Sequence, residues 1–142
     1  AVVMSLNNLA CLYQAEGLYA SAQRHFDEAL PLAERLSGPQ SALAGTIIGN
    51  MAFLADQQGL MAQAQLWYQR ALVIQQQQLG VHHPTVGLLV ERYAVVLDSI
   101  GQSVEAGLYA ARAASIRARS QPGAVKQGAV SYLGATVGEA SR

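Results

Sequence analysis

Residues 6–17 of the chain read LNNLACLYQAEG, and a related segment, IGNMAFLADQQG, returns 42 residues later at positions 48–59. A third version, VERYAVVLDSIG, occupies positions 90–101. All three versions carry alanine at the fifth position and end on glycine. A fixed period of this length is the sequence signature of a repeat protein. We therefore expect a fold built from three copies of one structural unit.

Each copy begins with the pattern of an amphipathic helix. In the first copy, Leu6, Leu9, Ala10 and Tyr13 are spaced i, i+3, i+4, i+7, which places them on one helix face. Gly17 is expected to end this helix, because glycine adopts the left-handed conformation at no steric cost. The same pattern and the same glycine stop recur in the second and third copies.

A second apolar stripe follows each glycine. In the first copy it consists of Ala22, Phe26, Ala29 and Leu30, and Pro31 falls within this helix, where proline favours a kink. No alternating strand pattern competes with the helices. The sequence thus predicts an all-α fold: an α-solenoid of three helix-turn-helix repeats at about residues 2–37, 42–79 and 84–119. Together these repeats form one predicted domain over residues 1–119.

Residues 120–142 differ in character from the repeats. A break at residues 121–123 is followed by Gly128, Gly134 and Gly138, each of which lowers helix propensity by about 1 kcal/mol relative to alanine. Apolar residues in this tail still fall near a helical stripe. We expect a short, poor capping helix over the third repeat, with disorder as the alternative.

These features resemble the tetratricopeptide repeat, in the 42-residue form found in kinesin light chains and in bacterial repeat arrays. Residues 5–13 resemble the first helix of that family, residues 17–19 its turn and residues 68–74 its second helix. The pair His83-Pro84 after Leu79-Gly80 resembles the linker between repeats. The resemblance covers about residues 2–119. It implies a right-handed α-solenoid whose first helices line the concave side, and a non-catalytic module of protein–protein interaction.

The chain also departs from the family pattern. The first linker lacks the His-Pro pair. The third repeat has Glu91-Arg92 where two asparagines are usual, and Ala110 where an aromatic residue is usual. The third repeat therefore looks like the last repeat of an array.

Composition excludes several classes of protein. The chain has 142 residues, a formal net charge of zero, and only 13% charged against 51% hydrophobic residues, which argues against long disorder and makes a nucleic-acid partner unlikely. No apolar run approaches a membrane span, and no signal peptide is visible, so we expect a cytoplasmic protein. A cluster of Arg112, Arg117 and Arg119 suits the dipole at the end of the last helix. The alternative is a basic patch for an acidic partner.

Candidate catalytic and metal-binding residues are few. His82 and His83 lack a third ligand at helical spacing, and His83 matches the linker motif, which favours a structural role. Cys11 is the single cysteine and has no evident base beside it, so an inert packing role is expected. We expect no enzyme activity, no metal, no cofactor and no small-molecule substrate.

Helical phase identifies a face on each first helix that could bind a partner. These faces carry one polar residue per repeat (Asn8, Asn50 and Arg92) among residues that are mostly apolar or small: Met4, Cys11, Ala15, Thr46, Phe53, Gln57, Leu88, Val95 and Ser99. The flanking positions are Asn7, Gln14, Asp56 and Asp98. Asparagine both donates and accepts hydrogen bonds, which suits the backbone of an extended peptide. In the resembling repeats, asparagines at this position contact peptide backbones.

The sequence therefore predicts a groove for a protein or peptide partner. It argues against the subtype that clamps a terminal carboxylate, because Arg92 is the single cation there and lies near Glu91 and Asp98. Two alternatives remain. The chain could self-associate as a homo-oligomer or scaffold by stacking through its open ends, or the tail could fold back into the groove as an internal ligand.

Overall fold

The computed structural model describes residues 2–120, which form six helices and no strand within that range. The helices are α1 (Val2–Ala15), α2 (Tyr19–Ser37), α3 (Ala42–Gln57), α4 (Met61–Leu79), α5 (Pro84–Ser99) and α6 (Ser103–Ser120). The predicted all-α class is confirmed. The tail expected after Ser120, including its roles as a cap or an internal ligand, lies outside the described residues.

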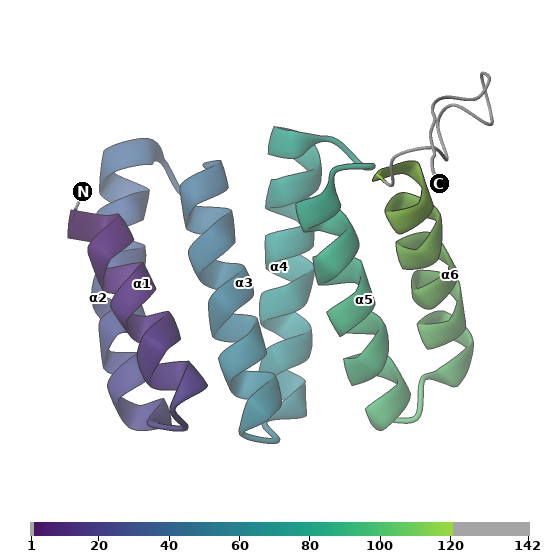
Figure 1. Cartoon of the computed structure of the whole chain (residues 1–142), viewed down its shortest axis with the longest axis horizontal. Helices are drawn as coiled ribbons and strands as arrows, with labels where there is room; N and C mark the ends of the chain where they lie inside the picture. Colours follow the sequence, from purple (N-terminus) through teal and green to yellow (C-terminus); the bar gives the residue numbers. More distant parts are fainter. Residues whose placement is uncertain (1, 121–142) are drawn as a thin grey trace, which may run out of the picture.

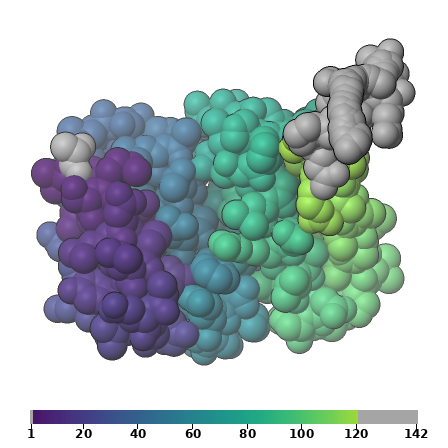
Figure 2. Space-filling view, viewed as in Figure 1, coloured from purple at the N-terminus to yellow at the C-terminus, as the bar shows by residue number. Residues whose placement is uncertain are grey.

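The helices stack as three antiparallel pairs along one axis (Figure 1). Helix α1 packs on α2, α3 on α4, and α5 on α6, while α2 contacts α3 and α4 contacts α5. Each pair therefore buries its apolar faces within the pair and against the next pair, as expected for a helical solenoid. In the space-filling view the pairs follow one another in sequence order from α1 at one end to α6 at the other (Figure 2).

Glycines end the first helix of each pair as predicted. Gly17, Gly59 and Gly101 have φ angles of 79°, 77° and 87°, in the left-handed region. This conformation turns the chain so that the Leu18 N–H donates to the Tyr13 carbonyl at 2.9 Å, and equivalent bonds close the other two turns. Such a bond satisfies a carbonyl that the end of the helix would leave without a partner.

The two linkers between pairs start the next helix with different side chains. The Thr85 N–H donates to His83 Nδ1 at 3.1 Å, and Pro84 occupies the first turn of α5. In the linker without a His-Pro pair, the Ala44 N–H donates to Ser41 Oγ at 3.1 Å. His83 therefore has the structural role predicted for it, and Ser41 supplies the same cap in the first linker.

Phe26 and Tyr68 are fully buried members of the hydrophobic core. Small residues allow the helices of the later pairs to approach closely. A Cβ atom at Gly45 would lie 2.8 Å from Gln75 Cδ, and one at Gly87 would lie 2.8 Å from Ile116 Cγ2. Glycine at these positions of α3 and α5 is thus required by packing rather than by a turn.

Helix α2 continues through Pro31, which is exposed on its surface. None of the helices in residues 2–120 combines the length and apolar character that crossing a membrane requires.

Candidate partner-binding site

The first helices of the three pairs lie together on one side of the stack. Helix α1 contacts α3 and α3 contacts α5, whereas within residues 2–120 the second helices make no such contacts with one another. The first helices therefore form the tighter, inner side of the stack. Residues in the same phase on α1, α3 and α5 can then form one continuous surface.

We use the name first-helix face for the surface that helical phase selected on these three helices. It consists of Met4, Asn8, Cys11, Ala15, Thr46, Asn50, Phe53, Gln57, Leu88, Arg92, Val95 and Ser99. None of these side chains is buried. The apolar members are open to solvent, with exposed fractions of 43% for Met4, 46% for Leu88 and 61% for Val95.

Two amide pairs join α1 to α3 beside this face. Asn50 Nδ2 donates to Asn7 Oδ1 at 3.0 Å, and Gln14 Nε2 donates to Gln57 Oε1 at 2.7 Å. Asn7 is only 4% exposed, and Gln14 is also buried. Asn7, a predicted partner contact, therefore has its side chain committed to holding the two helices together. Asn50 and Gln57 remain accessible at the surface.

A cationic side chain joins α3 to α5 at the next junction. The guanidinium carbon of Arg92 lies 3.8 Å from the centre of the Phe53 ring, which is the geometry of a cation–π interaction. Burial raises the pKa of the nearby Asp56 carboxyl, and the Tyr68 side chain and the Arg92 charge act in the opposite direction. Arg92 and Phe53 are both half-buried. This contact therefore involves two of the residues that were predicted to bind a partner.

Cys11 is half-buried on the first-helix face. Burial raises the pKa of its thiol, which disfavours the thiolate that nucleophilic chemistry needs. Within residues 2–120, no three His, Cys, Asp or Glu side chains are grouped so that they could hold a metal ion.

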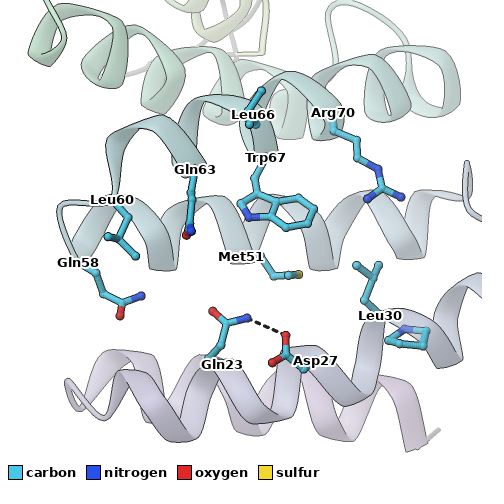
Figure 3. Close-up of a pocket in the computed structure, with 11 residues that line it drawn as sticks. Gln23, Asp27, Leu30, Met51, Gln58, Leu60, Gln63, Leu66, Trp67 and Arg70 are labelled. Atoms are coloured by element: carbon cyan, nitrogen blue, oxygen red, sulfur yellow. Dashed lines mark hydrogen bonds between the residues drawn. The ribbon is translucent and has the colours of Figure 1, made fainter.

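A concave surface that was not predicted lies between second helices of the stack. We call it the second-helix groove; it separates α2 from α4 and has a volume of about 810 Å³. Figure 3 shows Asp27 and Leu30 on one wall and Leu66 and Trp67 on the other, with Met51 of α3 between them. Sequence periodicity placed Leu30 in the apolar stripe of its helix and gave no sign that a groove would open beside it.

The chain is similar to known proteins both in sequence and in fold. The tetratricopeptide repeat family matches residues 2–77. Among solved structures, the chain is similar to the crystal structure of BtubC (BKLC) from P. vanneervenii, with a TM-score of 0.76 and 28% sequence identity over 82% of this chain. The match covers 47% of that protein, so this chain spans about half its length. No curated protein sequence matches significantly.

Proposed function

Because this chain belongs to the tetratricopeptide repeat family, of the kinesin-light-chain-like type, we propose that it binds an extended peptide segment of a protein partner on its first-helix face. Its role in this proposal is non-catalytic. The observation that carries the proposal is the continuity of the face: α1, α3 and α5 are neighbours, and none of the residues in phase on them is buried.

The chemistry of the face suits a peptide in extended conformation. Met4, Leu88 and Val95 offer exposed apolar surface at intervals, where side chains of a bound segment can lose contact with water. Asn8 is exposed one turn after Met4, and Asn50 uses its Nδ2 on Asn7, which leaves its carbonyl oxygen to accept a backbone N–H. Alternating apolar contacts and backbone hydrogen bonds are how extended peptides are commonly recognised.

The charge of the face selects against one kind of ligand. Arg92 is the cation of the first-helix face, and it lies over Phe53. A peptide that ends in a free carboxylate would need several converging cations, which this face does not supply. We therefore propose an internal segment of the partner, rather than a C-terminal end, as the ligand.

The test uses peptides selected for binding to the whole chain from a random display library. The face variant carries Met4→Ser, Leu88→Ser and Val95→Ser, which remove exposed apolar groups and spare the core. A control carries Val73→Ser, Val104→Ser and Leu108→Ser, which remove apolar groups that are at least as exposed as a set from the second helices. Binding is measured by fluorescence anisotropy, with helicity checked by circular dichroism.

The proposal expects selected peptides to bind the control as they bind the native chain and to lose about tenfold or more in affinity for the face variant. The lost contacts are three apolar anchors, and about 1.4 kcal/mol corresponds to a tenfold change. Peptides that bind all three proteins equally would show that recognition lies elsewhere. The proposal also places the module in the cytoplasm, which microscopy of the tagged chain tests.

A second candidate function, stacking with another copy of the chain, is favoured by the outer surface of α1. Leu12 is 62% exposed, whereas its counterparts in the later repeats, Leu54 and Val96, are fully buried. Val2 and Leu9 show the same contrast with their counterparts. We propose this surface as the contact of a self-associating or scaffold element.

Sedimentation velocity distinguishes the two candidates. If stacking is the function, the native chain associates as its concentration rises, and a Leu9→Ser, Leu12→Ser variant stays monomeric. A Val73→Ser, Leu108→Ser control should associate like the native chain. A native chain that is monomeric at every concentration would overturn self-association and leave the peptide-binding proposal intact.

A further inference from the structure

The second-helix groove is lined by both apolar and polar side chains. Its apolar lining includes Leu30, Met51 and Trp67, and its polar lining includes Asp27. Trp67 is half-buried and Met51 is nearly fully buried. The groove exists because α2 and α4 do not approach each other, so the side chain of Met51 is what separates it from the core (Figure 3).

The next repeat shows how the chain fills the equivalent position between α4 and α6. Forty-two residues after Met51 the chain has Tyr93, and the same shift takes Trp67 to Tyr109 and Asp27 to Gln69. The rings of Tyr93 and Tyr109 meet edge to face, with centroids 5.0 Å apart and an interplanar angle of 72°. Gln69 Nε2 donates to the Tyr93 hydroxyl at 2.8 Å.

The second-helix groove lacks counterparts of the Tyr93 ring and the Gln69 amide. Met51 provides no ring to pack against Trp67. Asp27 takes the place of the amide donor Gln69, and as a carboxylate it can only accept hydrogen bonds. It accepts one, from Gln23 Nε2 at 2.8 Å, and within residues 2–120 it forms no ion pair. An aromatic ring that carries a hydrogen-bond donor would complete this arrangement.

The other charged group of the groove is already neutralised. Arg70 forms an ion pair with Glu34 at 2.9 Å and lies 5.9 Å from the centre of the Trp67 ring. The free charge at the groove is therefore the negative charge of Asp27. This favours a ligand that donates to a carboxylate over one that is itself acidic.

We propose that the second-helix groove binds a tyrosine side chain of a protein partner, with the ring against Trp67 and Met51 and the hydroxyl donating to Asp27. The bound ring would pack on Trp67 as the Tyr93 ring packs on Tyr109 in the following repeat. The lining residues of α2 run from Gln23 to Pro31, about 12 Å of helix, which matches roughly four residues of an extended segment. This site is separate from the first-helix face and does not depend on it.

Trp67 is the only tryptophan of the chain, so its fluorescence reports on the groove directly. Peptides are selected by display on the native chain, with counter-selection on a Met51→Tyr variant. That variant supplies the ring from within and should block the site. Each selected peptide is then titrated against the native chain in its tyrosine form and in a form with phenylalanine at the same position, with Trp67 excited at the red edge of its absorption.

We expect the selected peptides to contain tyrosine, to change the Trp67 emission saturably, and to bind about tenfold more weakly as phenylalanine forms. The reason is the loss of one hydrogen bond to a charged acceptor. Asp27→Ala, an exposed helical position that should not affect folding, is expected to abolish the difference between the two forms. The face variant with Met4→Ser, Leu88→Ser and Val95→Ser should bind these peptides normally.

Three results would overturn the proposal: enrichment of peptides without tyrosine, equal affinity of the tyrosine and phenylalanine forms, or a preference for tyrosine that survives in Asp27→Ala. The Asp27→Ala comparison remains decisive if Met51→Tyr proves to be misfolded by circular dichroism. In that case, counter-selection uses Asp27→Ala instead.

Discussion

The guanidinium carbon of Arg92 lies over the Phe53 ring, 3.8 Å from its centre, and this contact links α5 to α3. Both residues belong to the first-helix face. One interaction therefore serves two purposes: it stabilises the junction between the second and third pairs, and it sets the shape of the surface offered to a partner.

Replacing Arg92 by methionine should lower the free energy of unfolding by about 1 kcal/mol, because the aliphatic part of the side chain is kept while the cation–π attraction is lost. Urea unfolding followed by circular dichroism measures the change. Arg119→Met, at an exposed position in the last turn of α6, is the matched control. Equal stability of the two variants would show that the Phe53 contact contributes nothing.

The hydrogen bond from Asn50 to Asn7 should appear as an energetic coupling. In a double-mutant cycle of Asn7→Ala and Asn50→Ala, we expect a coupling energy of about 1 kcal/mol, since each single change leaves a polar partner unsatisfied. The cycle of Asn8→Ala with Asn50→Ala should give a coupling near zero. Additive effects in the first cycle would contradict the pairing of these two helices through Asn7.

Alanine at Gly87 should destabilise the chain. The added Cβ would lie 2.8 Å from Ile116 Cγ2, and the resulting strain of about 1–3 kcal/mol outweighs the gain in helix propensity. Gly107→Ala on α6 is the natural control, because a Cβ there meets no atom within 4 Å. It should raise stability by about 0.5–1 kcal/mol. Thermal unfolding of both variants decides whether the α5–α6 approach depends on glycine.

The pH dependence of stability should carry a contribution from Asp56. Its pKa is raised in the folded state by burial, so near that pKa the folded chain binds more protons than the unfolded chain. The contribution of Asp56 to the free energy of unfolding therefore increases as the pH falls through the folded pKa, and it is smaller at neutral pH. Asp56→Asn removes this titration. The stability of the variant relative to the native chain should therefore be higher at neutral pH than in acid.

Urea unfolding at a series of pH values measures this difference, with Asp98→Asn as a control on the exposed flank of α5. A carbon-13 NMR titration of the Asp56 carboxyl gives the pKa directly. A value at or below that of an ordinary aspartate would contradict the effect of burial.

Much of the fold follows from local sequence. The recurrence of residues 6–17 at 48–59 and 90–101 marks the three first helices, and Gly17, Gly59 and Gly101 stop them where expected. Helix periodicity and the backbone freedom of glycine act within a few residues of the chain. They can therefore be recognised without knowledge of the partners of each helix.

The accessibility of the first-helix face could be predicted for the same reason, but the side-chain pairs beside it could not. Alignment at 42 residues sets Asn50 level with Asn8, which is exposed, whereas the folded chain bonds Asn50 to Asn7, 43 positions away. The pairing depends on how far α3 is displaced along α1. That displacement is decided by the packing of whole helices rather than by any one repeat.

By itself, the sequence determined the helical class, the stops of the first helices and the face of each helix that lies open, because these depend on short-range periodicity. Only the tertiary structure decided that Asn7 and Arg92 join helices, and that a groove opens where Met51 stands in place of a tyrosine. Both depend on distances between side chains of different helices. A repeat pattern makes successive pairs equivalent in backbone, but the volume of one side chain at a junction determines whether the space is filled.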